Sequence, residues 1–267
     1  MMIFNVLTIA GSDSSGGAGI QADLKTFSAL GVYGLSVITA LTAQNTQGVS
    51  AVEACTANFL SAQLKAVFND IRIDAVKIGM LSNAELVQVV ATALKRYKPP
   101  YTILDTVMIA KGGHSLLTKE AVQALRDILL PLVDLITPNL PEAAALSEEA
   151  IATDDATMCH QGRLLLVKGC KAVLIKGGHL SGAMSTDWLL TQDSTLAFSS
   201  PRILTNHIHG TGCTLSSAIA ALRVQRPNWP ITIQDAKNFL QEALVSSHRL
   251  NVGKGPIGPL HHFHQWW

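Results

Sequence analysis

Short apolar runs of strand length alternate along this chain with longer segments of helical periodicity, and this alternation limits the folds it can adopt. The expected strands are 6–10, 35–41, 75–78, 102–105, 135–137 and 172–176. The expected helices are 18–30, 59–68, 85–97, 120–130, 212–226 and 233–250. Such alternation predicts βαβ units with right-handed crossovers and a mostly parallel sheet. The strand runs are apolar throughout, which is typical of a sheet covered by helices on both faces.

The chain of 267 residues is long enough for one large α/β domain, and it shows no linker, low-complexity tract or internal repeat. We therefore expect a single doubly wound domain over residues 1–267. Residues 184–199 hold β-like pieces around a central turn, which predicts a hairpin at a sheet edge. Within the second helix, Phe59, Leu60 and Leu64 are expected on the buried face. In this architecture ligands bind at the carboxyl ends of the strands.

Composition excludes several classes of partner. The formal net charge is +1, which does not favour nucleic acid or an anionic membrane, and the basic cluster 95–98 is expected to be a solvated helix end. The four cysteines form no CxxC pair, as expected of a reduced cytosolic protein. No apolar run approaches the ~18 residues of a membrane span, and the N-terminus lacks the basic start of a signal peptide. The sequence predicts a cytoplasmic protein.

The segment from His209 to Cys213 reads His-Gly-Thr-Gly-Cys and leads directly into an apolar helix. Gly210 and Gly212 allow positive φ and close approach of the backbone to a ligand. The helix start adds unpaired N–H groups and a positive dipole end, so the segment is suited to binding phosphate. A thiolate is also favoured there, which makes Cys213 a candidate reactive group. The alternative is that the glycines only end the preceding segment and the cysteine only packs.

A Gly/Ser-rich loop at 11–19 follows the first strand. Its glycines do not have the Gly-x-Gly-x-x-Gly spacing, and no acidic residue ends the second strand, so a dinucleotide cofactor is not expected. Asp23 lies just after this loop and is expected to face the ligand crevice. The loop could instead be a plain turn, and Asp23 an ordinary carboxylate on a helix face.

Two further residues follow strands and are suited to a heteroaromatic ligand. Gln44 offers one acceptor and two donors, which match a ring that carries an amino group and a ring nitrogen. Met80 offers a polarizable thioether that packs well against an aromatic ring. A solvent-exposed turn amide and a core methionine are the respective alternatives.

Oxygen ligands and a lysine follow the later strands. Asn139 and Glu142 are three residues apart and share one face if the segment is helical, which suits Mg²⁺ bound through water. Asn139 could instead cap the helix. Lys176 ends a buried strand before two glycines, which indicates a phosphate contact, although a lysine there could also reach past the sheet to solvent.

These motifs, in this order, resemble the bacterial hydroxymethylpyrimidine/phosphomethylpyrimidine kinases of thiamine biosynthesis, within the ribokinase superfamily. The resemblance covers nearly the whole chain. The matching segments are 8–27, 42–45, 76–81, Asp105 with 107–113, 137–142, 176–179, 210–213 and 258–263. It implies a ribokinase-like fold and ATP- and Mg²⁺-dependent phosphorylation of 4-amino-5-hydroxymethyl-2-methylpyrimidine, then of its monophosphate. It also implies a homodimer.

The resemblance assigns roles to single residues. The pyrimidine-binding positions that match are Gly11, Asp23, Gln44, Met80 and Val107. The positions that match nucleotide, phosphate or Mg²⁺ contacts are Asp105, Asn139, Glu142, Lys176 and Lys237. The anion hole matches Gly210, Thr211, Gly212 and Cys213, with Cys213 in the position of the catalytic base.

The chain departs from the pattern at Thr106, where the family usually has proline. Loss of that proline is expected to loosen the turn without removing a catalytic group. Cys213 stands where most of the superfamily has aspartate, and cysteine is typical of the pyrimidine-kinase branch. We expect the Cys213 thiolate to accept the proton of the substrate alcohol in the first phosphorylation, and to matter less in the second.

Three other interpretations remain open at this stage. A pyridoxal or pyridoxine kinase would bind a similar heterocycle with a hydroxymethyl group. A nucleotide-sensing module could retain the kinase fold without turnover. A metal site at His261, His262 and His264 is less favoured, because a terminal tail is usually disordered or docked. Residues 112–119 are candidates for a mobile segment over the site.

Overall fold

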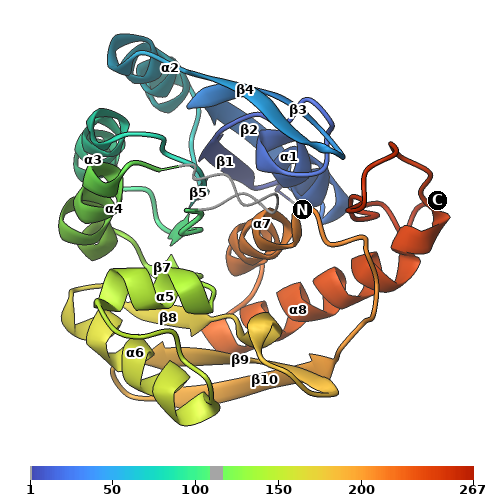
Figure 1. Ribbon diagram of the computed structural model, residues 1–267. Coiled ribbons are helices and arrows are strands. Elements are labelled where there is room, and N and C mark those ends of the chain that lie inside the picture. Colours follow the sequence, from blue (N-terminus) through green and yellow to red (C-terminus); the bar gives the residue numbers. More distant parts are fainter. Residues whose placement is uncertain (1, 109–116) are drawn as a thin grey trace.

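A computed structural model of the chain describes residues 2–108 and 117–267. These residues form an eight-stranded sheet in the order β10-β9-β8-β7-β6-β5-β1-β2 (Figure 1). Its strands are β1 (Asn5–Ala10), β2 (Tyr33–Ile38), β5 (Ala75–Ile78), β6 (Thr102–Leu104), β7 (Leu135–Ile136), β8 (Ala172–Ile175), β9 (Met184–Thr191) and β10 (Thr195–Pro201). Strands β2, β1, β5, β6, β7 and β8 run parallel, whereas β9 and β10 form an antiparallel hairpin at one edge. The parallel sheet and the edge hairpin are therefore confirmed.

Helices cover both faces of this sheet, as the apolar strands predict. The helices are α1 (Gly19–Ala29), α2 (Ala57–Asp70), α3 (Ala84–Tyr97), α4 (Lys119–Ala124), α5 (Leu140–Ser147), α6 (Asp155–Val167), α7 (Thr211–Arg223) and α8 (Trp229–Ser246). Helices α2 to α6 pack on one face, and α1, α7 and α8 on the other (Figure 1). Successive residues of β1 alternate between the two cores, with Val6 in one and Leu7 in the other.

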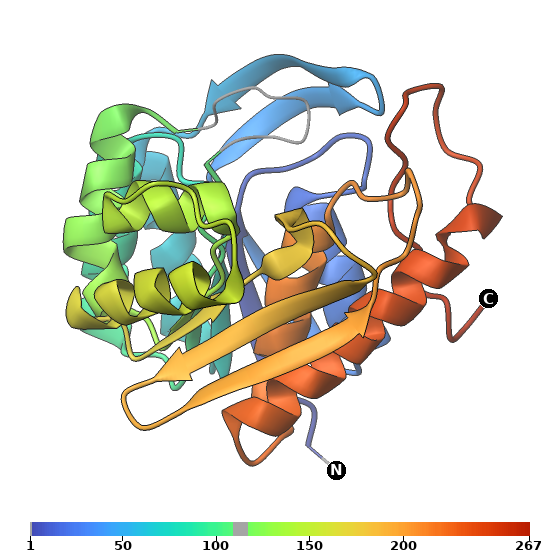
Figure 2. The same cartoon turned by 60° about the horizontal axis from the view of Figure 1, so that its bottom comes forward.

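The second expected strand is shorter than predicted, because the chain turns at Thr39. The backbone N–H of Thr39 donates to Ala10 O, and the Thr39 carbonyl accepts from Cys55 N. Strands β3 (Ala40–Asn45) and β4 (Gly48–Ala54) then pair with each other as a separate two-stranded sheet (Figure 2). Gln44 was expected to follow the second strand, but it lies within the separate strand β3.

Other boundaries also differ from expectation. Phe59 is 60% exposed, so it does not share the buried face of α2 with Leu60 and Leu64. The helix expected over 120–130 continues from α4 into a π-helical turn (Leu125–Leu129). Helices α5 and α6 were not delimited by the sequence, although both begin with a side-chain capping box.

The C-terminal segment is docked on the body of the protein. His261 and His262 are buried, and His262 Nε2 lies 3.0 Å from Thr214 Oγ1 in α7. Across residues 2–108 and 117–267 no three side chains of His, Cys, Asp or Glu are grouped as metal ligands. In the same ranges, none of the helices combines the length and apolar character needed to cross a membrane.

Candidate active site

A cavity of about 870 Å³ lies where the parallel strands end. Its wall includes Gly11 after β1, Met80 after β5, Asp105 after β6, Asn139 after β7 and Lys176 after β8. This is the carboxyl edge of the sheet, where the sequence predicts the ligand crevice. The start of α7 and the inner side of α8 complete the wall.

The start of α7 forms an anion-binding corner of the cavity. Gly210 has φ 86°, and a side chain there would collide with the carbonyl of Gly17, so glycine is required. Thr214 N donates to Gly210 O, so the preceding N–H groups of Gly212 and Cys213 have no acceptor within the helix. Both residues line the cavity, where these N–H groups and the helix dipole favour a phosphate.

Lys176 stands beside this corner between two carboxylates. Its Nζ lies 3.2 Å from Asp105 Oδ1 and 4.0 Å from Glu142 Oε2. Burial opposes a charge on Lys176, but the charges of Asp105 and Glu142 prevail and raise the pKa of its ammonium group. Burial, reinforced by Asp105 and opposed by Lys176, raises the pKa of Glu142. An added Cβ at Gly212 would lie 3.6 Å from Lys176 Nζ, so the ammonium group adjoins the anion corner directly.

Glu142 and Asn139 are tied to one another at the start of α5. Glu142 N donates to Asn139 Oδ1, and Asn139 N donates to Glu142 Oε2, each at 2.9 Å. The capping role considered for Asn139 is therefore confirmed. Thr106 Oγ1 also donates to Glu142 Oε2, at 3.0 Å. The hydroxyl of Thr106, the position where the family usually has proline, thus helps to hold the Glu142 carboxylate on the cavity wall.

Asp105 and Glu142 are suited to a magnesium ion. Both are carboxylates that line the cavity on either side of Lys176, and Mg²⁺ prefers such oxygen ligands with water completing its shell. With two carboxylates beside Lys176, most of the coordination would come from water and phosphate oxygens. The residues present therefore fit a nucleotide-borne Mg²⁺ better than an ion held by protein alone.

Cys213 lies in the first turn of α7 on the cavity wall. The expectation that the helix start favours its thiolate is wrong for this structure. Burial raises the pKa of the Cys213 thiol to about 11. The Lys77 ammonium opposes this rise, while the carboxylates of Asp23 and Asp105 add to it. At neutral pH the group is a thiol.

Asp23 does not face the crevice as predicted, because it is fully buried next to the site. Both of its oxygens accept hydrogen bonds from Lys77 Nζ at 2.9 Å. Thr8 Oγ1 and Ser217 Oγ each donate a further bond, at 2.6 Å. Both oxygens of the Asp23 carboxylate are thus engaged in hydrogen bonds within the protein. Its hydrogen-bond partner Lys77 lines the cavity, and its charge also acts on Cys213.

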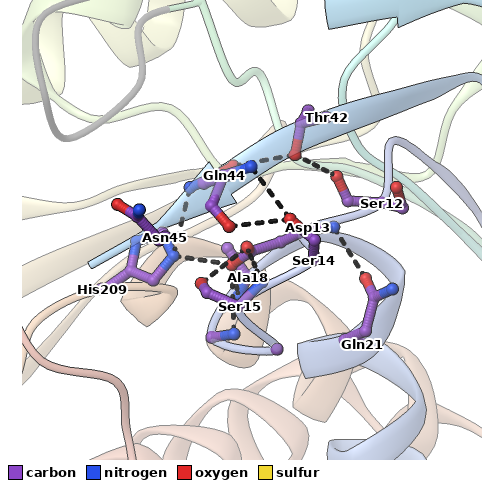
Figure 3. Close-up of polar contacts among 12 residues, drawn as sticks. Ser12, Asp13, Ser14, Ser15, Ala18, Gln21, Thr42, Gln44, Asn45 and His209 are labelled. Carbon is purple, nitrogen blue, oxygen red and sulfur yellow. Dashed lines mark hydrogen bonds and ion pairs between the residues drawn. The ribbon is translucent and has the colours of Figure 1, made fainter. Parts of the chain in front are cut away.

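The remaining residues expected to contact the heterocycle lie together. Gly11, Gln44, Met80 and Val107 all line the cavity. An added Cβ at Gly11 would be 3.2 Å from Met80 Cε, so the absent side chain makes room for the thioether. The β3–β4 hairpin brings Gln44 to the cavity beside the Gly/Ser-rich loop (Figure 3).

Several residues of the site were given no role by the sequence. A contact of 2.7 Å between Asp13 Oδ2 and His209 Nε2 joins the two glycine-rich loops (Figure 3). Asp187 of β9 accepts from Lys237 Nζ at 2.5 Å and from Gly177 N at 2.9 Å, so it places Lys237 on the cavity wall beside the Lys176 loop. The sequence signal that could have pointed to Asp187 was an acidic residue within the expected edge hairpin.

Of the candidate mobile segment 112–119, residues 112–116 lie outside the described residues.

A mostly parallel sheet flanked by helices, with a helix-start anion site and a lysine between carboxylates at its carboxyl edge, defines the ribokinase-like class of small-molecule kinases. A family model described as phosphomethylpyrimidine kinase matches residues 13–261. The chain belongs to this family.

Similar proteins span the same length. The hydroxymethylpyrimidine/phosphomethylpyrimidine kinase of Escherichia coli is 57% identical over 267 residues, which is 100% of both chains. A crystal structure of phosphomethylpyrimidine kinase from Clostridium difficile has a TM-score of 0.81 at 44% identity and covers 90% of this chain and 99% of that one. Bacillus subtilis pyridoxal kinase, solved as an ADP complex, has a TM-score of 0.91 at 34% identity and covers 99% of each chain.

Proposed function

We propose that this chain uses ATP to phosphorylate 4-amino-5-hydroxymethyl-2-methylpyrimidine and then phosphorylates the monophosphate to the diphosphate, for thiamine diphosphate synthesis. One observation carries the proposal. One cavity is lined both by Gln44 and Met80, which suit a heterocycle, and by the anion corner at 210–213. The full-length identity of 57% to the Escherichia coli kinase supports the same substrates.

Each residue then has a chemical role. In the first reaction the substrate hydroxyl oxygen forms a bond to the γ-phosphorus of ATP, and the bond from that phosphorus to the β–γ bridging oxygen breaks. The ionised form of Cys213 takes the hydroxyl proton, and ADP leaves. The N–H groups of Gly212 and Cys213, in the anion hole at 210–213, hold the transferred phosphoryl group in place. Lys176 and Lys237 offset the charge of the nucleotide, with Asn139 at the same wall.

We further propose that Asp105 and Glu142 bind Mg²⁺ through water. The ion supplies charge neutralisation of the β- and γ-phosphates when it is bound. Gly11, Gln44, Met80 and Val107 form the pocket for the heterocycle, and Thr211 belongs to the anion hole. Asp23 does not line the pocket, and its carboxylate holds the Lys77 ammonium group in place.

Pyridoxal kinase activity is the second candidate, favoured by the TM-score of 0.91 to the Bacillus subtilis pyridoxal kinase. An ATP-consumption assay on the pyrimidine alcohol, its monophosphate and pyridoxal in parallel separates the two. Faster turnover of both pyrimidines supports the first proposal. Preference for pyridoxal would replace it, and ATP binding without turnover of any heterocycle would indicate a sensing module.

We also propose a homodimer of single-domain subunits in the cytoplasm, on the strength of the family resemblance. Light scattering coupled to size-exclusion chromatography tests the assembly. A mass close to the 28.4 kDa of one chain would contradict it.

A further inference from the structure

The Gly/Ser-rich loop at 11–19 and the loop before α7 enclose the imidazole of His209. A side chain at Gly17 would collide with the His209 ring, and one at Gly210 would collide with the Gly17 carbonyl. His209 Nε2 lies 2.7 Å from Asp13 Oδ2 (Figure 3). Only 12% of the His209 side chain is exposed. The ring is therefore fixed in position and orientation.

The partners of Asp13 define where the imidazole carries its hydrogen. Asp13 accepts hydrogen bonds from the N–H and hydroxyl of Ser15 and from the N–H groups of Gly17 and Ala18. Although burial opposes its charge, the hydrogen bonds and charge of His209 and the bonds from Ser15 lower the pKa of Asp13 to about 2. Asp13 is ionised and can only accept hydrogen bonds. Nε2 of His209 must therefore bear a hydrogen and donate it.

Gln44 is the next group in this chain of contacts. In the structure Gln44 Nε2 lies 3.3 Å from His209 Nε2, and Gln44 Oε1 lies 3.2 Å from Thr42 Oγ1, and a half-turn of the amide exchanges the two atoms. Thr42 Oγ1 already donates its hydrogen to Ser12 O at 2.8 Å. The end facing His209 meets an N–H whose single hydrogen is directed mainly at Asp13, so an oxygen there shares that hydrogen whereas an NH₂ group would face another donor. The end facing Thr42 meets an oxygen lone pair, because the Thr42 hydrogen is already donated. The two ends of an amide have the same shape and are distinguished only by such partners.

We propose that His209 is a positioning residue that sets substrate specificity: its N–H, anchored on Asp13, holds the Gln44 amide with the carbonyl oxygen toward the imidazole and the NH₂ group toward Thr42. In this orientation each contact of the amide with His209 and Thr42 pairs a donor with an acceptor. The carbonyl keeps its second lone pair and the NH₂ group its second hydrogen for a ligand. Gln44 lines the cavity, so the cavity presents one acceptor and one donor in a fixed order.

This order selects among heterocycles, and the inference rests on the proposed function. An aminopyrimidine presents an amino donor beside a ring-nitrogen acceptor, which pairs with both positions of the amide. Pyridoxal presents no amino group beside its ring nitrogen and cannot make both bonds. An amide in the opposite orientation, with its NH₂ group toward His209, would face the aminopyrimidine with two mismatched contacts. The His209–Asp13 pair thus favours the pyrimidine without touching it.

The first test is independent of turnover. Long-range ¹H–¹⁵N NMR of the ligand-free protein, labelled in histidine, is expected to show His209 Nε2 protonated. An unprotonated Nε2 at neutral pH would overturn the inference even if the protein proves to be a pyrimidine kinase. Conversely, failure of wild type to phosphorylate any pyrimidine removes the proposed function and the specificity role together, while the protonation result stands by itself.

The second test compares three variants. His209→Leu removes the N–H and is expected to raise KM for the pyrimidine alcohol about tenfold, the effect of one lost hydrogen bond. KM for pyridoxal, KM for ATP and kcat should change less than about twofold. His209→Gln restores an N–H donor near the Nε2 position and should recover most of the lost affinity. His207→Gln is the matched control, because His207 precedes the same helix and contacts Pro259 O rather than the cavity. Equal changes in KM for pyrimidine, pyridoxal and ATP in His209→Leu, or no recovery in His209→Gln, would refute the specificity role.

Discussion

Replacing Cys213 with alanine is expected to slow phosphorylation of the pyrimidine alcohol much more than phosphorylation of its monophosphate. An alcohol must lose its proton as it attacks, whereas a phosphate nucleophile is already anionic. Cys213 is the thiol on the cavity wall next to the anion corner. Alanine keeps the start of α7 intact, so ATP binding should change little.

The size of the effect follows from the burial of the thiol. With a pKa of about 11, about one Cys213 in 3,000 is ionised near pH 7.5. A positioned base contributes roughly 10²–10⁴-fold, and a rarely ionised one falls at the lower end. We therefore expect a loss of about 10²-fold for the alcohol and less than about threefold for the monophosphate. The wild-type rate on the alcohol should rise about tenfold per pH unit between about pH 7 and 9.

Single-turnover rates, with enzyme in excess of substrate, measure this chemistry apart from product release. Both steps are followed across the pH range in wild type, Cys213→Ala and Cys159→Ala. Cys159 is the matched control, since it is a half-buried thiol on α6 that does not line the cavity. Its replacement should leave both profiles unchanged. Equal losses in the two steps, or a flat pH profile for the alcohol in wild type, would refute the role of base and leave the 210–212 backbone as the main catalytic element.

Three other variants test the remaining assignments. Gln44→Leu should preserve the fold and lose about 1–3 kcal/mol of pyrimidine binding through unpaired ligand groups; an unchanged KM for the pyrimidine would remove Gln44 from the site. Glu142→Gln should weaken apparent Mg²⁺ affinity more than pyrimidine affinity, whereas the same change at the exposed Glu148 should not; normal ATP kinetics at low Mg²⁺ would contradict the metal assignment. Lys77→Met leaves Asp23 buried without its cation and should lower the free energy of unfolding by about 3–5 kcal/mol in urea titrations, and a loss below about 1 kcal/mol would count against the buried pair.

The sequence predicted the parallel sheet and the place of the site because continuous apolar strands and the residues that follow them are local signals. Gly11, Asp105 and Lys176 each follow a strand directly, and the topology brings their positions to one edge. The β3–β4 hairpin was missed because it is not part of that sheet. Leu41 was placed in the second core strand because it is apolar, although it is 53% exposed, and no strand was predicted over 48–54.

The errors at the site have a different origin, since they depend on residues far apart in sequence. Asp23 was expected in the crevice, but its partner Lys77 is 54 positions away and draws it inside. The pKa of Cys213 depends on burial and on Lys77, Asp23 and Asp105 together, whereas the sequence shows only the helix start. The Asp13–His209 pair spans 196 positions. Pairings of this kind carry no local pattern.

The charges around the anion corner support the proposal that the triphosphate binds here together with Mg²⁺. Lys77 and Lys176 face Asp23, Asp105 and Glu142, so the ionised cluster has one negative charge in excess. Metal-free ATP would meet repulsion, whereas Mg²⁺ offsets both the cluster and the phosphates. Glu142→Gln removes the excess charge while glutamine retains the capping oxygen. It should therefore strengthen binding of metal-free ATP and weaken binding of Mg²⁺-ATP, and calorimetry with and without chelator distinguishes these opposite changes from a general loss of structure.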